Sequence, residues 1–341
     1  MILPICLGAQ RYDIVLERGC LARAGEYLNL RRHVFIVTDD GVPGACAQSL
    51  AAQCPAHTLV VIPQGEASKS FDAFRALLSR MLAAGLTRGD CVAAVGGGVV
   101  GDLAGFAAAC YMRGVDFYNI PTTVLSQVDS SIGGKTAIDL DGVKNVAGAF
   151  YQPRGVLIDT ELLATLPPRQ TANGLAEAVK MALCLDGDGF ALFEGERPLD
   201  RLDEIIERSL RIKRDVVERD EKERGLRRVL NFGHTLGHGI ESLRDENGLY
   251  HGECVALGML PMCSDAVRRR LLPVLKRLGL PTACDAGAER VMQAVMHDKK
   301  RDGEGVNAVL VNEVGRCEVR RLTFPALRAR YEDWFEGGGR A

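Results

Sequence analysis

Residues 91–112, CVAAVGGGVVGDLAGFAAACYM, join an apolar run to a helix-forming run through a cluster of glycines. The run CVAAV predicts a buried β-strand, and LAGFAAACYM has the composition of a helix. GGGVVG at 96–101 matches the pattern G-x-G-x-x-G, in which glycines let the backbone approach a pyrophosphate and the helix N-terminus supplies N–H donors. This stretch therefore predicts a strand–turn–helix unit that binds a dinucleotide.

The residues on either side extend this unit into a larger sheet. Apolar, β-branched runs at Val34–Val37, Thr58–Ile62 and Phe117–Ile120 predict three further strands, and Ser70–Ala84 has helical periodicity. Alternating strands and helices favour a parallel sheet with helices on both faces. We therefore expect a Rossmann-like α/β domain, which binds a dinucleotide, over residues 1–165.

Ligands of such folds bind at the carboxyl ends of the strands. Asp39, the glycines at 96–98 and the pair Thr122–Thr123 all follow predicted strands. The threonine pair stands where a dinucleotide fingerprint usually has an acidic residue, at the end of the strand after the glycine loop. We therefore expect a variant mode of nucleotide binding, with Asp39 as the candidate acid for the ribose and Asp102 inside the glycine motif.

The second half of the chain is mostly helical in its pattern. Helices are predicted at Asn173–Cys184, Leu202–Arg224, Asn231–Leu243, Glu253–Arg270 and Ala288–His297, with a short strand pair near Ala308–Val311 and Arg316–Val319. The segment LPPRQ at 166–170 marks the boundary. We expect a mostly α-helical, metal- and substrate-binding domain over residues 166–341, and an active site in the cleft between the two domains.

The composition is typical of a soluble globular protein. The chain has 341 residues, of which 47% are hydrophobic and 25% charged, and its formal net charge is −2. This balance gives no reason to expect a nucleic-acid partner, and no run of about 20 apolar residues predicts a membrane span. The 11 cysteines form no CxxC pair and the N-terminus resembles no secretory signal, so we expect a cytoplasmic protein without a disulfide framework.

Three of the six histidines, His234, His238 and His251, lie close together in the sequence. NFGHTLGH, written as one helix, places the first two on one face together with Asn231 and Glu241. Clustered histidines near carboxylates predict a metal or catalytic site, and zinc accepts nitrogen and oxygen ligands where cysteine pairs are absent.

Two ligand sets fit this cluster. One consists of His234, His238 and His251. The other replaces His238 with Glu177, which shares a helix face with Lys180, and leaves His238 for proton transfer. Spacing alone does not choose between them. The segment HTLGH lacks the glutamate of H-E-x-x-H, which disfavours a zinc protease.

Basic residues next to small or apolar stretches predict a site for phosphate and carboxylate oxygens. The segment DSSIGGK at 129–135 ends in such a lysine. The other candidates are Lys144 with Asn145, Arg113, Arg227, and the pair Lys299 and Lys300.

Long motifs of this chain carry a resemblance to a known family. In order they are GGGVVGDLAGFAAACYMRG, IPTTVLSQVDSSIGGKTAID, KNVAGAFYQP, GLAEAVKMAL, ERGLRRVLNFGHTLGH, HGECVALGM and DKK. They resemble the 3-dehydroquinate synthase family of the sugar-phosphate cyclase superfamily. The resemblance implies an NAD- and zinc- or cobalt-dependent carbon–oxygen lyase that converts 3-deoxy-D-arabino-heptulosonate 7-phosphate into 3-dehydroquinate and phosphate. This reaction belongs to the shikimate pathway of aromatic amino-acid biosynthesis.

The same resemblance implies roles for individual residues. The implied metal ligands are Glu177, His234 and His251. The implied NAD contacts are Asp39, Glu66, Lys69, Gly97, Gly98, Asp102, Thr122, Thr123, Asp129, Lys135 and Lys144. The implied substrate contacts are Arg113, Asp129, Lys144, Lys180, Lys213, Asn231 and a lysine of the pair Lys299 and Lys300. The implied catalytic residues are Lys135, Asn145, Glu223, Arg227 and His238.

Three alternatives stand beside this interpretation. A sister cyclase of the deoxy-inosose or valiolone type shares the NAD and metal motifs. The dehydroquinate reaction is favoured by the presence of Arg227, Asn231, His238 and the triplet Asp298, Lys299 and Lys300. A glycerol-dehydrogenase-like oxidoreductase would produce net NADH and would not need Lys135 and Lys144. A catalytically inactive paralogue would not need intact metal ligands. Relatives of the family also imply a homodimer.

Overall fold

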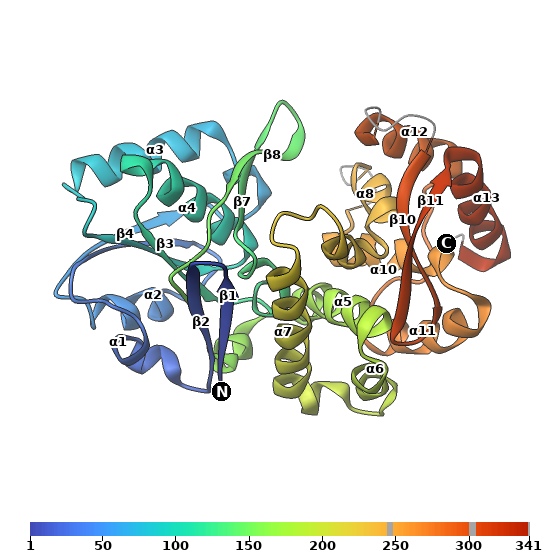
Figure 1. Ribbon diagram of the computed structural model, residues 1–341, viewed down its shortest axis with the longest axis horizontal. Coiled ribbons are helices and arrows are strands. Elements are labelled where there is room, and N and C mark those ends of the chain that lie inside the picture. The colour runs from blue at the N-terminus through green and yellow to red at the C-terminus, as the bar shows by residue number, and fades with distance from the viewer. Residues whose placement is uncertain (244–247, 300–304, 340–341) are drawn as a thin grey trace. The chain divides into compact units, whose positions relative to one another are not determined.

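The computed structural model describes residues 1–243, 248–299 and 305–339, with the backbone alone for 297–299. The chain forms two compact units (Figure 1). Unit 1 comprises Met1–Pro167 and Lys213–Glu221, and unit 2 comprises Pro168–Ile212 and Lys222–Ala341. The pattern predicts one domain over 166–341, whereas Lys213–Glu221 packs with unit 1. The long-range hydrogen bonds of this segment explain the difference, since the backbone N–H of Cys6 donates to Glu218 at 2.7 Å.

Unit 1 is built on a seven-stranded sheet. Its strands are β1 (Ile2–Leu7), β2 (Gln10–Leu16), β3 (His33–Asp39), β4 (Ala56–Ile62), β5 (Cys91–Gly96), β6 (Asp116–Pro121) and β9 (Gly155–Ile158). They lie in the order β1-β2-β9-β6-β5-β3-β4, and all neighbours except β1 and β2 are parallel. The four strands expected from the sequence are confirmed as β3, β4, β5 and β6. The other three are additional.

Helices cover both faces of this sheet, as the alternation of elements predicts (Figure 1). They are α1 (Ala24–Tyr27), α2 (Gly44–Ala51), α3 (Phe71–Ala83) and α4 (Gly98–Cys110), and a separate hairpin is formed by β7 (Lys135–Leu140) and β8 (Val143–Phe150). The helix expected from Leu103 starts earlier, at Gly98, so the glycine motif itself forms the first turn of α4.

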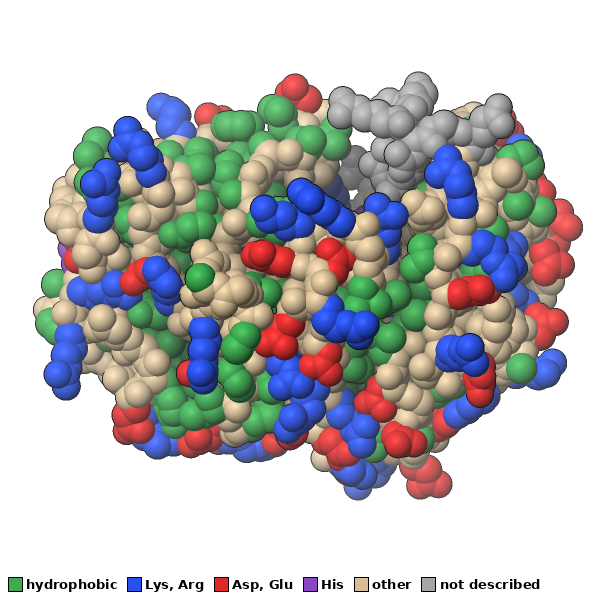
Figure 2. All heavy atoms as spheres, viewed as in Figure 1, with side chains coloured by type: hydrophobic (Ala, Val, Ile, Leu, Met, Phe, Trp, Pro, Cys, Tyr) green, Lys and Arg blue, Asp and Glu red, His purple; other side chains and the backbone are tan. Residues whose placement is uncertain are grey.

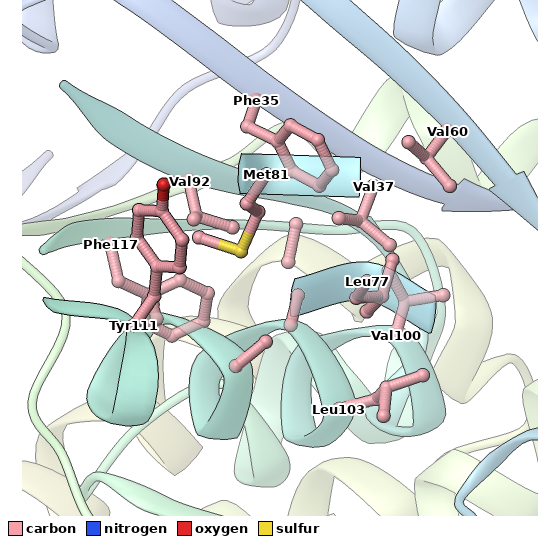
Figure 3. Packing of buried hydrophobic residues seen from close by; sticks show 14 of the residues in the cluster. Phe35, Val37, Val60, Leu77, Met81, Val92, Val100, Leu103, Tyr111 and Phe117 are labelled. Carbon is pink, nitrogen blue, oxygen red and sulfur yellow. The ribbon is translucent and has the colours of Figure 1, made fainter. Parts of the chain in front are cut away.

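Alternate residues of the strands build two separate cores. Phe35 and Val37 of β3 point to one face, where they pack with Leu77, Met81 and the apolar side of α4 (Figure 3). Val34 and Ile36 point to the other face and pack with Leu50 of α2. Each fully buried aliphatic or aromatic side chain contributes about 1.5–3 kcal/mol to folding. Burial on both faces holds the strand ends, and the loops that follow them, in place.

Unit 2 is mostly helical, as expected. Its helices are α5 (Pro168–Leu185), α6 (Gly187–Glu194), α7 (Leu202–Arg219, whose last residues from Lys213 belong to unit 1), α8 (His234–Glu241), α10 (His251–Met259), α11 (Asp265–Arg277), α12 (Ala288–Lys299) and α13 (Phe324–Trp334). The strands β10 (Gly305–Glu313) and β11 (Arg316–Thr323) form the expected pair, which is antiparallel; β10 is longer than expected at both ends and β11 at its C-terminal end.

Four expected helices differ in extent: α5 begins at Pro168 and not at Asn173, α7 ends at Arg219 and not at Arg224, and the other two are interrupted. Asn231–Leu243 does not form one helix, because Gly233 adopts a left-handed conformation with φ 77° and α8 starts only at His234. Glu253–Arg270 is divided into α10 and α11 by a 3₁₀ turn that contains Pro261. Ser264 then begins α11 by accepting a hydrogen bond from the backbone N–H of Val267. Asn231 is consequently not on α8, the helix that carries His234 and His238.

Within the residues that the structure describes, every helix is too short or too polar to traverse a lipid bilayer. On the face that Figure 2 shows, basic and acidic side chains are interspersed, in line with the net charge of −2.

Candidate functional site

The glycine loop of unit 1 lies at the carboxyl end of β5, beside the end of β6. Gly96 is paired with Pro121 in the sheet, and the backbone N–H of Thr122 donates to the carbonyl of Gly96 at 3.0 Å. Gly97 is the N-cap of α4. The first N–H groups of an α-helix have no intrahelical partner and carry positive potential. Gly97, Gly98, Thr122 and Thr123 therefore form one backbone-rich edge that suits a pyrophosphate.

Asp39 ends the neighbouring strand β3. Its side chain is buried, and its Oδ1 accepts hydrogen bonds from the backbone N–H groups of Gly41 and Val42 at 2.9 and 3.1 Å. Burial raises the pKa of Asp39, while the two hydrogen bonds oppose this shift. The residue expected to bind the ribose thus also holds the turn after β3.

Lys69 gathers several of the predicted NAD and catalytic residues. Its side chain is 4% exposed, and its ammonium lies 2.8 Å from Asp102 and 3.5 Å from Glu66 and donates to the side chain of Asn145. Burial lowers the pKa of Lys69, but Asp102 and Glu66 outweigh this effect and raise it. Burial raises the pKa of Asp102 to about 6, against the pull of Lys69. This cluster ties α4 to the hairpin β7–β8, which also carries Lys144.

Besides the cluster around Lys69, unit 1 contains an ion pair between Asp129 and Lys213. The buried Lys213 donates to the backbone carbonyl of Asp129 at 2.8 Å and forms an ion pair with its carboxylate. The other predicted basic residues of this unit, Arg113, Lys135 and Lys144, are exposed. The resemblance implies that Lys213 contacts the substrate, and the structure pairs Lys213 with Asp129 of the DSSIGGK segment.

In unit 2, three helices bring Glu177 of α5, His234 of α8 and His251 of α10 together. Their candidate ligand atoms all lie within 4.8 Å of one another. Glu177 is 0% exposed, and its Oε1 lies 3.7 Å from Nε2 of His234 and 3.4 Å from Nε2 of His251. Among the described residues, no group donates a hydrogen bond to this buried oxygen. A buried carboxylate oxygen that faces two imidazole nitrogens fits a divalent metal ion.

The other ring nitrogens of the two histidines are already engaged. Nδ1 of His234 lies 3.1 Å from the backbone carbonyl of Phe232, and Nδ1 of His251 lies 3.0 Å from Glu241. Such contacts leave both Nε2 atoms for a metal, and a carboxylate behind a histidine strengthens it as a ligand. The structure gathers the set with Glu177, and no three-histidine set is found in the described ranges.

Charge accounts for the protonation of this cluster. Burial favours a protonated Glu177, but the positive Lys180 and the two histidines hold the pKa of Glu177 well below its usual range. Burial lowers the pKa of His234 well below its usual range, which keeps the ring neutral as a metal ligand requires. Burial also lowers the pKa of His251, but its contacts with Glu177 and Glu241 outweigh this and raise it to about 9. A metal ion would take the place of that proton.

Of the remaining predicted residues of unit 2, Lys180 and His238 lie against this cluster. Lys180 is buried and donates to the other oxygen of Glu177, and His238 lies with its ring centroid 5.3 Å from that of His234. Glu223 accepts a hydrogen bond from Asn231 at 2.6 Å. Arg227 is buried in the 3₁₀ turn Leu226–Asn231.

The predicted substrate contacts at Lys299 and Lys300 lie outside the described side chains. Sequence reasoning missed the role of Glu241 behind His251. Its one signal was its place on the helix face of the histidines, which did not single it out as a partner of His251.

The two halves of the chain match family models. Residues 59–173 match the 3-dehydroquinate synthase N-terminal model, and residues 174–301 match the C-terminal one. A 3-dehydroquinate synthase of Pelobacter propionicus is 40% identical, with 96% of this chain and 97% of the relative covered.

Solved structures of two other enzymes are also similar. One is 2-deoxy-scyllo-inosose synthase complexed with carbaglucose-6-phosphate, NAD+ and Co2+, which is 25% identical with a TM-score of 0.87 over 98% of this chain and 100% of that one. The other is 2-epi-5-epi-valiolone synthase from Streptomyces hygroscopicus with NAD+ and Zn2+, which is 28% identical with a TM-score of 0.87 over 96% of this chain and 98% of that one. Since identity to the curated relative is higher and runs through nearly the whole length, this chain belongs to the 3-dehydroquinate synthase family.

Proposed function

We propose that this chain converts 3-deoxy-D-arabino-heptulosonate 7-phosphate into 3-dehydroquinate and phosphate. The observation that carries the proposal is the cluster of Glu177, His234 and His251, in which a buried carboxylate oxygen faces two ring nitrogens beside the buried Lys180. This arrangement suits a metal that acts on a substrate hydroxyl. The choice of this substrate rests on relatives that are 40% identical over nearly the full length.

We assign different roles to the two expected domains. Residues 1–165 bind NAD at the edge formed by Gly97, Gly98, Thr122 and Thr123, and residues 166–341 hold the metal and much of the substrate-binding set. When bound, NAD supplies the transient oxidation of a ring hydroxyl and the metal ion polarises that oxygen.

The side chains of this protein bind the substrate and manage its protons. Lysine and arginine groups, among them Arg113, Lys144 and Arg227, hold the phosphate and carboxylate of the substrate, which fixes the reacting atoms. In the elimination step a proton leaves the carbon beside the transient ketone, and the bond between carbon and the phosphate oxygen breaks with its electron pair on that oxygen. His238, exposed next to His234, is the group that we assign to proton transfer.

The cofactor is regenerated in each turnover, which provides the test. Phosphate release from the substrate should require only catalytic NAD, stop with a chelator, return with zinc, and occur without accumulation of NADH absorbance. A folded protein that binds both zinc and NAD but releases no phosphate would rule out this substrate. Net NADH would instead indicate a glycerol-dehydrogenase-like oxidoreductase.

The sister cyclases are the second candidate, because their solved structures superpose on this chain with TM-scores of 0.87. Sedoheptulose 7-phosphate and glucose 6-phosphate are the substrates that distinguish them. Turnover of either one in place of the heptulosonate would move the assignment to that class.

We further propose that the chain acts as a homodimer in the cytoplasm. The homodimer is what the resemblance implies, and light scattering of the purified chain would measure it. The free thiols of its 11 cysteines fit a reducing compartment.

A further inference from the structure

One face of α5 contacts the first three residues of α10 in succession. Arg169, Asn173 and Glu177 are spaced by four positions, so they lie on one side of the helix. Arg169 binds Glu253, Asn173 binds the backbone of Gly252, and Glu177 faces His251. These three contacts form a row between the two helices, and we call each contact a rung. The third rung joins the two candidate metal ligands, Glu177 of α5 and His251 of α10.

The first rung is a bidentate ion pair. Nε and an Nη of Arg169 each donate to a different oxygen of Glu253, both at 2.7 Å, and the guanidinium lies 4.1 Å from the ring centroid of Tyr250. Glu253 is 6% exposed, and it also accepts a hydrogen bond from the backbone N–H of Tyr250 at 2.7 Å. One arginine therefore holds both the residue before His251 and the residue two positions after it.

The second rung holds the backbone next to the ligand. The buried Asn173 accepts a hydrogen bond from the N–H of Gly252 at 2.6 Å. That N–H belongs to the first turn of α10, where the helix itself offers no partner. On one side of His251, α5 therefore binds the backbone directly through Asn173; on the other side it contacts the ring of Tyr250 and, through Glu253, the backbone N–H of Tyr250.

We propose that Arg169, Asn173 and Glu253 are positioning residues of the metal site, which set His251 against Glu177 without touching the metal. The inference rests on the proposed metal site and deepens it. Metal affinity then depends on a residue two helical turns away from the ligand on the same helix. Outer residues that orient metal ligands are worth about 10–100-fold in affinity.

Arginine is required at position 169 by its geometry, beyond its charge. Lysine keeps the charge and the apolar stem but presents a single point of contact, so it loses the fork that binds both oxygens of Glu253. Arg169→Lys is therefore the sharpest variant, because it separates orientation from electrostatics.

A matched control exists in the same unit. Arg270 binds Glu194 in the same bidentate way, with both distances at 2.8 Å, and its guanidinium lies over the ring of Phe190. The exposed fractions of the two arginine side chains, 50% for Arg169 and 48% for Arg270, are nearly equal. Arg270→Lys thus reproduces the loss of a bidentate pair on α11, away from the metal ligands.

The test measures the affinity of the full-length protein for zinc alone, by competition with a chromogenic chelator. Arg169→Lys and Asn173→Ala should each weaken zinc binding about 10-fold, and Arg270→Lys should leave it within about twofold of wild type. With zinc in excess, the turnover of the Arg169 and Asn173 variants should return to wild type, because only loading is impaired.

The outcomes separate this inference from the proposed function. Glu177→Gln serves as the reference, since the proposed metal site fails if this substitution leaves zinc binding unchanged. If Glu177→Gln abolishes binding while Arg169→Lys and Asn173→Ala bind like wild type, the positioning role alone is overturned. It is also overturned if Arg270→Lys weakens zinc to the same extent. Thermal unfolding of each variant is recorded, and Glu253→Gln replaces any variant that does not fold.

Discussion

The N-terminus of α4 in unit 1 and the N-terminus of α10 in unit 2 each stand at a candidate site, but they are built by different means. The first offers backbone N–H groups from a glycine turn that lies between β5 and its own helix. The second offers a side chain, His251, which needs Glu177 and His234 from two other helices. A backbone site can be local in sequence, whereas a side-chain site has to be assembled by the fold.

The two sites also differ in how they bear charge. The glycine edge relies on helix-end N–H groups and on Asp39, whose partners are backbone groups. The metal cluster buries Glu177 beside Lys180, with side-chain exposures of 1% and 2%. Breaking a buried pair by removing one charge costs about 3–5 kcal/mol. We therefore expect substitutions that remove a charge to impair the candidate site of unit 2 most, and substitutions that enlarge a side chain to impair the candidate site of unit 1.

The largest effect is expected at Glu177. Glu177→Gln removes the charge that faces His234 and His251 and leaves Lys180 buried without its carboxylate. Loss of metal polarisation removes several kcal/mol of transition-state stabilisation, so phosphate release should fall by about 10³-fold. Phosphate release at saturating NAD and zinc measures it. Glu194→Gln, at a more exposed ion pair of the same unit, should retain activity, and equal losses in both variants would remove the distinction between the clusters.

The next effect concerns a buried charge in unit 1. Burial raises the pKa of Asp102 to about 6, above the value of about 3.9 in an unfolded chain. The folded state therefore binds this proton more tightly, and the resulting stability is fully present below about pH 3.9 and is lost as the pH rises through about 6. Between pH 7.5 and 4.5, wild type should gain about 2 kcal/mol relative to Asp102→Asn.

Urea unfolding of both proteins at the two pH values measures this difference, because other titrating groups cancel between them. Asp72→Asn, an exposed substitution on α3, is the control and should show no such change with pH. A difference between wild type and Asp102→Asn that stays constant with pH would mean that Lys69 keeps Asp102 ionised throughout.

Local signals explain which parts of the fold could be predicted. β3, β4, β5 and β6 are short apolar runs bounded by turn residues. The sequence pattern that identifies each of these strands therefore lies within a few consecutive residues. β9 has only four residues, GVLI, and gains its place by pairing with β2 and β6. Periodicity also overextended the helix at Asn231, because an apolar pattern does not register the left-handed turn at Gly233.

The candidate sites follow the same rule. The glycine edge was predictable because its strand, turn and helix are consecutive. The spacing of the histidines left two ligand sets open, and only packing of α5 against α10 brings Glu177 to His251. No local pattern indicates that Lys69 reaches Asn145, since 76 positions separate them.

A larger side chain at the glycine edge should weaken NAD binding by unit 1 and leave zinc binding by unit 2 unchanged. A Cβ atom at Gly97 would lie 3.1 Å from Cγ2 of Thr123, and the branched side chain of Gly97→Val would also keep a pyrophosphate from the backbone. Overpacking of this kind costs about 1–3 kcal/mol, so NAD affinity should fall about 5–150-fold. Fluorescence titration with NAD measures it, and zinc affinity should stay unchanged. Gly44→Val, at the start of α2, is the control, because a Cβ atom there would meet only Nε2 of Gln48 at 4.0 Å. NAD binding unaffected by Gly97→Val would argue against this edge as the nucleotide site.

The smallest effect tests whether the side-chain site depends on charge behind its ligands as well as on the ligands themselves. Glu241→Gln keeps an oxygen that can accept from Nδ1 of His251 but removes its negative charge. A hydrogen bond to a charged group is worth about 1 kcal/mol more than a neutral one, so zinc affinity should fall about fivefold. His234 is the internal comparison, because its Nδ1 contacts a neutral backbone carbonyl and has no carboxylate as its partner there. If Glu241→Gln binds zinc like wild type while Glu241→Ala does not, orientation of the ring is what matters, and both histidines are then held in the same way.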